Sequence, residues 1–110
     1  MKDHIVVLVT AKDAQEARKI GTALLEQKLA ACVNIVPGVE SLFWWQGKLD
    51  QAAEVMLVIK SRKDLFEKIV ATVKALHSYE VPEVIALPVA AGHQDYLRWL
   101  DESVSPAPRG

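Results

Sequence analysis

The chain has 110 residues, of which 13 are lysine or arginine and 14 are aspartate or glutamate, for a formal charge of −1. This length supports one core, so we expect a single domain over residues 1–104 and a disordered tail over residues 105–110, which lacks an apolar face. The balanced charge argues against electrostatic nucleic-acid binding, which calls for a basic surplus on one face.

The cysteine content and the N-terminal sequence indicate a compartment. Cys32 is the only cysteine, so no intrachain disulfide can form and a reducing environment is suitable. Residues 5–9 form the longest apolar run near the N-terminus, which is far shorter than a membrane span, and no signal-peptide pattern is present. We therefore expect a cytoplasmic protein that does not insert into a membrane.

The first 30 residues predict a strand followed by a helix. Residues 5–9 are apolar and mostly β-branched, which is typical of a central strand buried on both faces. Asp13 and Glu16 have the spacing of a capping box, in which each side chain bonds the other residue's backbone amide. Apolar residues then recur at helical spacing, so the helix is expected to reach about Lys28.

A long hairpin is predicted next. Residues 31–36 form a strand, Pro37-Gly38 predicts a bulge or bend because proline has no amide hydrogen to donate, and the strand resumes over residues 39–45. Gln46-Gly47 predicts the turn, and residues 49–60 form the returning arm. That arm alone would span about 40 Å, against a radius of gyration of about 13 Å for a domain of this size. The hairpin should therefore extend beyond its own core.

Three consecutive aromatic residues, Phe43, Trp44 and Trp45, stand beside this turn. Since the domain's own core cannot reach them, we predict that they form an oligomer interface. Alternation along the strand places Phe43 and Trp45 on one face and Trp44 on the other, so that one ring could line a cleft while its neighbour packs.

The second half of the chain predicts a helix, a strand and a short terminal helix. Ser61 and Asp64 mark the start of the second helix, which should end near His77. Residues 84–87 form the fourth strand, and residues 96–100 suggest the terminal helix. The order βαββαβ predicts an α+β, ferredoxin-like sandwich with two helices on one sheet face. The other face would be apolar, which is a second reason to expect an oligomer.

Several segments resemble those of a known family: Lys28-Leu29-Ala30-Ala31-Cys32-Val33-Asn34, Trp45-Gln46-Gly47-Lys48, Tyr79-Glu80-Val81-Pro82-Glu83, Leu87-Pro88-Val89 and Asp95-Tyr96-Leu97-x-Trp99-Leu100. In this order they resemble the CutA family of divalent-cation tolerance proteins, over residues 5–100. The resemblance implies a ferredoxin-like homotrimer similar to PII signalling proteins, with a link to copper and other divalent metals.

Only some of the residues associated with copper binding in this family are present in the sequence. Copper-binding members are associated with a cysteine in the first strand and two adjacent histidines after the second helix, whereas here these positions read Val9 and Leu76-His77. His77 is thus a candidate ligand for Cu(II) or another divalent cation, or else a partner of the helix's last carbonyls. Cys32 is a buried structural residue or, alternatively, a ligand. Since tight sites use three or four ligands, we expect weak or interface-dependent binding.

A second candidate site follows from the resemblance, which implies a cleft between subunits. A lysine, a carboxylate and aromatic rings that converge there would suit a small polar or anionic ligand. The alternative for each polar residue is a solvated or salt-bridged role. The candidate residues are Trp45, Lys48, Glu54, Lys60, Tyr79 and Glu83.

No nucleophile elbow, phosphate-binding glycine loop or H-E-x-x-H motif is present in the sequence. Cys32 and His77 could in principle form a nucleophile–base pair, but nothing brings them together or adds an orienting group. We therefore expect a non-enzymatic divalent-cation tolerance protein. The alternative is a PII-like small-ligand sensor or signalling adaptor that uses the intersubunit cleft.

Overall fold

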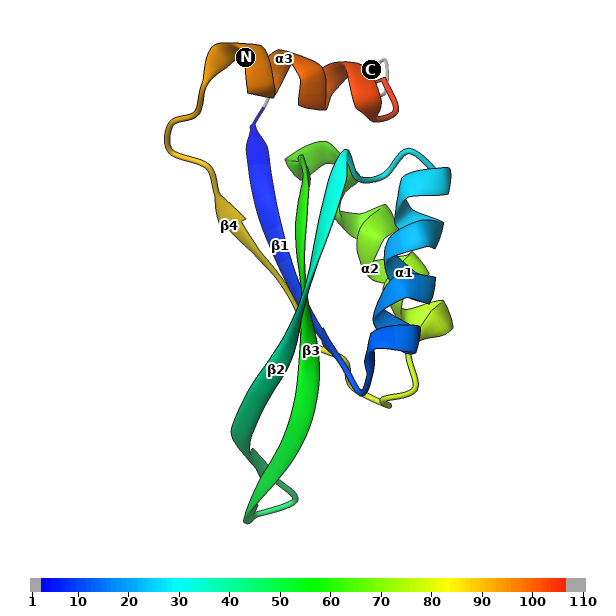
Figure 1. The fold of residues 1–110 in the computed structure, drawn as a ribbon, viewed down its shortest axis with the longest axis vertical. Helices are drawn as coiled ribbons and strands as arrows, with labels where there is room; N and C mark the ends of the chain where they lie inside the picture. The colour runs from blue at the N-terminus through cyan, green and yellow to red at the C-terminus, as the bar shows by residue number, and fades with distance from the viewer. Residues whose placement is uncertain (1–2, 107–110) are drawn as a thin grey trace.

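The computed structural model describes residues 3–106, so residues 107–110 of the predicted disordered tail (105–110) lie outside this range, whereas Ser105 lies inside it and its backbone bonds Lys28 and Arg62. Its elements follow the expected order, with a short 3₁₀ turn before the second helix and a terminal helix (Figure 1). They are β1 (His4–Ala11), α1 (Ala14–Glu26), β2 (Cys32–Trp45), β3 (Lys48–Arg62), η1 (Lys63–Leu65), α2 (Phe66–Leu76), β4 (Val84–Pro88) and α3 (Gln94–Ser103). The predicted α+β, ferredoxin-like fold is confirmed.

The four strands form one antiparallel sheet in the order β2-β3-β1-β4. Helices α1 and α2 lie together on one face of this sheet (Figure 1). Between them and the sheet lies a core in which Val7, Ile20, Leu57 and Ile69 are fully buried. The alternating burial of β1 is typical of a strand whose one face packs on helices.

The hairpin of β2 and β3 extends past the helices at the lower end of Figure 1. The register shifts between Val36 and Val39, so the bulge predicted at Pro37-Gly38 is confirmed. Gln46 and Gly47 have φ angles of 50° and 79°, as a two-residue I′ turn requires. The longest molecular extent is 44 Å against 25 to 26 Å in the other two directions. The hairpin therefore accounts for the elongated shape.

The predicted start of the second helix at Ser61 is wrong. Ser61 and Arg62 continue β3 and pair with Ile5 and His4 of β1. The Ser61 hydroxyl donates to the carbonyl of Leu29 at 2.6 Å instead of capping a helix. Pairing with β1 thus prolongs the strand, and α2 begins at Phe66 after the η1 turn.

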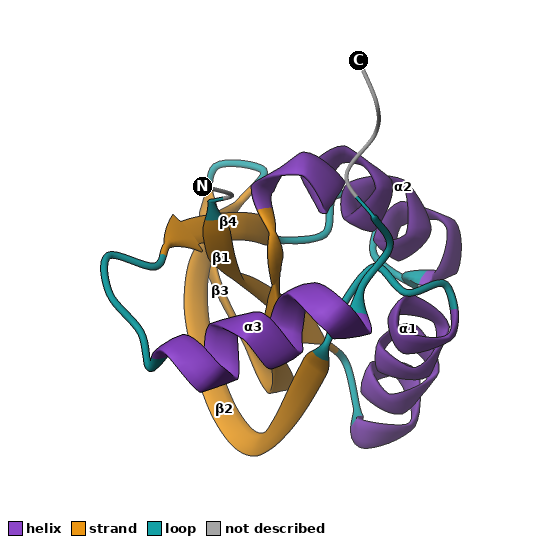
Figure 2. Cartoon of the chain, turned by 90° about the horizontal axis from the view of Figure 1, so that it is seen from above, coloured by secondary structure: helices purple, strands orange, loops and turns teal. Residues whose placement is uncertain are grey.

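Helix α3 lies across the end of the sheet where β1 begins (Figure 2). It is tied to the body by Arg62, whose side chain is only 1% exposed and bonds Asp64 and the Ser105 carbonyl. Asp101 of α3 lies 3.0 Å from His4 and 3.7 Å from Arg62. Within residues 3–106, no helix is long and apolar enough to cross a membrane.

Candidate functional site

The sheet face opposite the helices is apolar, as expected. Val6 and Leu8 of β1 pair with Leu87 and Ile85 of β4, and these side chains alternate with β1 residues buried beneath the helices. Ile85 and Leu87 are each 50% exposed, and Val36 of β2 is 43% exposed. Such a row of large apolar side chains in contact with water marks a surface suited to a protein partner.

The tip of the hairpin is a second exposed apolar surface. Leu42, Trp44 and Leu49 are 71 to 72% exposed, while Phe43 and Trp45 on the other face are 37% and 44% exposed. No part of the chain within residues 3–106 fully covers any of these five side chains. We call them the tip cluster. Its position confirms that the hairpin carries large apolar rings beyond the domain's own core.

His77, the candidate metal ligand, is fully enclosed, with a side-chain exposure of 0%. Its Nε2 atom lies 2.7 Å from the carbonyl oxygen of Thr10, and its Nδ1 atom accepts a hydrogen bond from the backbone amide of Tyr79 at 3.0 Å. Both ring nitrogens are therefore engaged, and we do not assign His77 as a metal ligand. A metal would have to displace one of these bonds.

Cys32 lies far from His77, at the start of β2, opposite Lys60 of β3. Its Sγ atom is 3.9 Å from the Lys60 ammonium, which also bonds the Asn34 side chain. Burial, together with the nearby Cys32 thiol, raises the pKa of Tyr96 on α3. Among residues 3–106, no three His, Cys, Asp or Glu side chains gather as a metal site would require. The described residues of one chain thus do not by themselves form a metal site.

The residues predicted to line a cleft are spread along the hairpin. Trp45 and Lys48 face each other at its turn, and Lys60 lies near the other end of β3, opposite Cys32. From Lys48 to Lys60, the strand spans roughly 40 Å. Glu83 is exposed in the loop before β4. A cleft formed by all six residues would therefore need parts of more than one chain.

Two of the six do meet. The Tyr79 hydroxyl donates to Oε2 of Glu54 at 2.7 Å, and Glu54 is only 8% exposed. Burial and the hydrogen bond to the Glu54 carboxylate raise the pKa of Tyr79 well above its ordinary value. This pair joins the loop after α2 to β3 at the base of the free part of the hairpin.

A partly buried polar centre, not expected from the sequence, lies beside this pair. It comprises Thr10, Glu16, His77, Ser78 and Tyr79. Glu16 accepts bonds from the backbone amide and the hydroxyl of Ser78 at 2.6 and 2.9 Å, and its Oε1 atom lies 3.2 Å from Nδ1 of His77. Burial would raise the pKa of Glu16, but the Ser78 bonds and His77 outweigh it, so this pKa lies below its usual value.

The capping box predicted for α1 is therefore half wrong. Asp13 does accept from the backbone amide of Glu16 at 2.8 Å, but the Glu16 carboxylate bonds Ser78 instead of returning to Asp13. A signal for this was present in the sequence. Glu16, Ile20 and Leu24 recur every four residues on the buried stripe of α1, which places a carboxylate on the apolar face and requires a buried partner.

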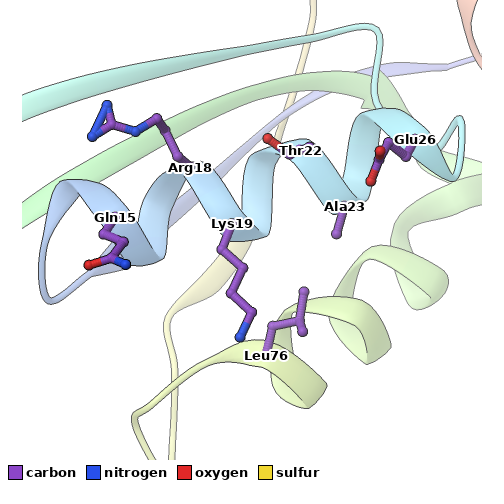
Figure 3. Close-up of a pocket in the computed structure, with 7 residues that line it drawn as sticks. All are labelled: Gln15, Arg18, Lys19, Thr22, Ala23, Glu26 and Leu76. Atoms are coloured by element: carbon purple, nitrogen blue, oxygen red, sulfur yellow. The ribbon is translucent and has the colours of Figure 1, made fainter.

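Two surface grooves contain none of the predicted site residues. One of about 490 Å³ lies on the outer side of α1, where the end of α2 approaches it (Figure 3). Its lining residues are Gln15, Arg18, Lys19, Thr22, Ala23, Glu26 and Leu76. A larger groove of about 1050 Å³ lies between the loop after β4, α3 and the start of α2. Neither groove holds a convergent set of buried polar groups.

Comparison with known proteins identifies the family. The family of the CutA1 divalent ion tolerance protein matches residues 5–103. The chain belongs to the CutA1 family. The "Divalent-cation tolerance protein CutA" of Thermus thermophilus is 49% identical over 98 residues, which are 89% of this chain and 95% of the relative. The rice "Protein CutA 1, chloroplastic" is 48% identical over 90% of this chain, which spans only 56% of that relative's length.

Solved CutA structures have the same fold. The divalent cation tolerance protein of Thermus thermophilus superposes with a TM-score of 0.91 at 47% identity, covering 93% of this chain and 99% of the other. For the Archaeoglobus fulgidus protein, which is named periplasmic, the TM-score is 0.90 at 43% identity, with 93% and 99% covered. The resemblance expected from the motifs is confirmed. The family supports the divalent-cation tolerance function and not the small-ligand sensor.

Proposed function

We propose that this CutA family member works as a homotrimer that binds divalent cations where its subunits meet. The single observation that carries the proposal is the pair of uncovered apolar surfaces, the tip cluster and the open sheet face. Both need a partner of the same extent, and another copy of the chain supplies one in a closed symmetric assembly. The number three comes from the resemblance to trimeric CutA and PII proteins.

The cation follows from the relatives, which are named for tolerance of divalent cations. Since the side chains of one chain do not gather into a metal site within residues 3–106, binding is weak or depends on the interface. Glu80 and Glu83 are exposed on the loop that also carries Val81, which is 71% exposed. They are the carboxylates that a neighbouring subunit is best placed to complete. Cu(II) is the first cation to test.

The test combines mass with metal titration. Light scattering after size exclusion should give three times the chain mass, and calorimetric titration of Cu(II) should show binding that is weakened by the double variant Glu80→Gln/Glu83→Gln. Glu102→Gln, an exposed carboxylate on α3, is the matched control and should bind as the parent does. A monomeric mass would overturn the assembly. Binding indifferent to the loop carboxylates, or no binding, would overturn the cation site.

A further inference from the structure

The Nδ1 atom of the buried His77 ring lies close to one hydrogen-bond donor and one hydrogen-bond acceptor, whereas its Nε2 atom has a single partner. The carbonyl of Thr10 can only accept a hydrogen bond, so Nε2, 2.7 Å away, carries a hydrogen in every protonation state. The other nitrogen, Nδ1, is 3.0 Å from the Tyr79 backbone amide and 3.2 Å from Oε1 of Glu16. An amide can only donate, whereas an ionised carboxylate can only accept. Nδ1 therefore cannot satisfy both at once.

Glu16 remains the accepting partner in this competition. The backbone amide and the hydroxyl of Ser78 both donate to its carboxylate. These bonds favour the ionised form, in line with the lowered pKa of Glu16. In the neutral ring, the lone pair of Nδ1 accepts the hydrogen bond from the Tyr79 amide, and the same lone pair repels the Glu16 carboxylate. A protonated ring donates from Nδ1 to Glu16 and presents a hydrogen to the Tyr79 amide, which repels it.

We propose that His77 is a proton-operated switch for the loop of residues 77–83. When Nδ1 takes a proton from solvent, its hydrogen bond passes from Tyr79 to Glu16, and the backbone at Tyr79 moves away. Acidification thus releases the loop. The other ring bond, to Thr10, is unchanged and keeps the imidazole in place. The proposal does not depend on the oligomeric state or on metal binding.

Each element packed near the ring adds to this electrostatic setting. α1 presents Glu16, while Lys12 and the N-cap residue Asp13 precede that helix, and β1 contributes the Thr10 carbonyl. The loop contributes Tyr79, whose ring centroid is 4.6 Å from that of His77 and whose hydroxyl bonds Glu54 of β3. On α2 itself, the last turn carries the exposed Lys74. Three of these groups are carboxylates and two are lysines.

The consequence for the loop is specific. Tyr79 is held at both ends, by its amide on His77 and by its hydroxyl on Glu54. Loss of the amide bond leaves one attachment between the loop and the base of the hairpin. Val81, Glu80 and Glu83 follow within four residues, so the surface that these exposed side chains present changes with pH.

Nuclear magnetic resonance tests the switch in the intact protein. At neutral pH, the His77 ring should be the tautomer with its hydrogen on Nε2. On acidification, the protection of the Tyr79 amide against hydrogen exchange, relative to the unfolded chain at the same pH, should fall by about tenfold, the order expected for loss of one hydrogen bond. Glu16→Gln should move this fall to lower pH, because the Gln carbonyl still accepts from Nδ1 but lacks the negative charge that stabilises a protonated ring.

Two controls make the result decisive. Glu67→Gln removes an exposed carboxylate from α2, and His93→Gln removes a histidine whose side chain is 75% exposed. Both should leave the response of Tyr79 unchanged. A neutral ring with its hydrogen on Nδ1 would overturn the proposal, and this measurement needs no variant. A Tyr79 amide whose protection is constant, or that responds at the same pH in Glu16→Gln, would also overturn it.

Discussion

Both halves of β3 pair with β2, but only residues 55–62 also pair with β1, and the surroundings of the two halves are opposite. Leu57 and Ile59, in the half beneath the helices, are 0% exposed, whereas Leu49, in the free half, is 71% exposed. Cross-strand pairing to β2 continues through both halves. The comparison shows that hydrogen bonding along a ladder shapes the hairpin, while the helices bury its side chains in one half and leave them open to water in the other.

The largest expected difference between the two halves is in the stability lost when a leucine of each half is replaced by alanine. Leu57→Ala should lower the free energy of unfolding by about 2–5 kcal/mol, because it leaves a cavity in the core. Leu49→Ala should cost far less within one chain, since its side chain already contacts water. Urea unfolding at one fixed protein concentration measures both. Equal losses would mean that the free half has a core of its own.

The tip cluster should affect assembly instead of chain stability. Trp44→Ala should weaken association by about 2 kcal/mol or more, the scale of a buried aromatic anchor. Sedimentation over a dilution series measures the shift. Leu25→Ala, which removes a 42% exposed leucine on the helical side, serves as the control and should associate as the parent does. A Trp44→Ala assembly as resistant to dilution as the parent would contradict the interface.

Tyr79 sits at the boundary between the halves and should make stability sensitive to alkali. Since the pKa of Tyr79 is raised above its ordinary value of 10.0, its neutral phenol stabilises the fold below pH 10, and this contribution is lost as pH rises above 10. Tyr79→Phe should cost about 1 kcal/mol at neutral pH through the lost bond to Glu54. It should also flatten the decline above pH 10. An unchanged alkaline decline would assign it to other groups.

A smaller, stabilising change is expected at the end of α1. The amides of Lys28 and Leu29 bond the carbonyls of Leu25 and Leu24, which is a Schellman motif with Lys28 at φ 56°. Glycine adopts this conformation without steric cost, so Lys28→Gly should raise the free energy of unfolding by about 1 kcal/mol. Lys28→Ala should give no such gain. Thermal unfolding of the two variants measures the difference.

The smallest effect should appear at the hairpin turn. Gln46 has a φ of 50°, and asparagine is preferred at this position of an I′ turn. Gln46→Asn should slow hydrogen exchange of the amides near the turn by a few-fold while the amides of the helix-covered half stay unchanged. A uniform change in both halves would show that the tip does not open independently.

Local features of the fold could be predicted, because their causes are local. Gly47 and Pro37 act through their own backbones, so the turn and the bulge could be found from short segments. The exposure of the tip cluster could be predicted because the returning arm of the hairpin is longer than a domain of this size can cover. The strand that continues through Ser61 could not be predicted, because its partner in β1 lies more than 50 residues earlier in the chain.

The site was less predictable for the same reason. Glu16 and Ser78 are 62 residues apart, and the spacing of apolar residues along the sequence cannot predict which distant residue bonds Glu16. His77 was chosen from a motif position, which says nothing about whether its nitrogens are already bonded. The six cleft residues were grouped by family likeness, but β3 separates Lys48 from Lys60 by most of its length. Within residues 3–106, Glu54 bonds Tyr79 and Trp45 pairs with Lys48, but the first pair lies at the base of the free hairpin and the second at its turn.

The position of β1 inside the sheet also affects how the chain can fold during synthesis. β1 pairs only with residues that are made later, 55–62 on one side and 84–88 on the other, and its first residue, His4, contacts Asp101, 97 residues onward. Folding with such long separations is slow, because large loops must close before their contacts form. The apolar strand β1 is made before both of its partner strands, so it stays unpaired until they follow and needs a chaperone meanwhile.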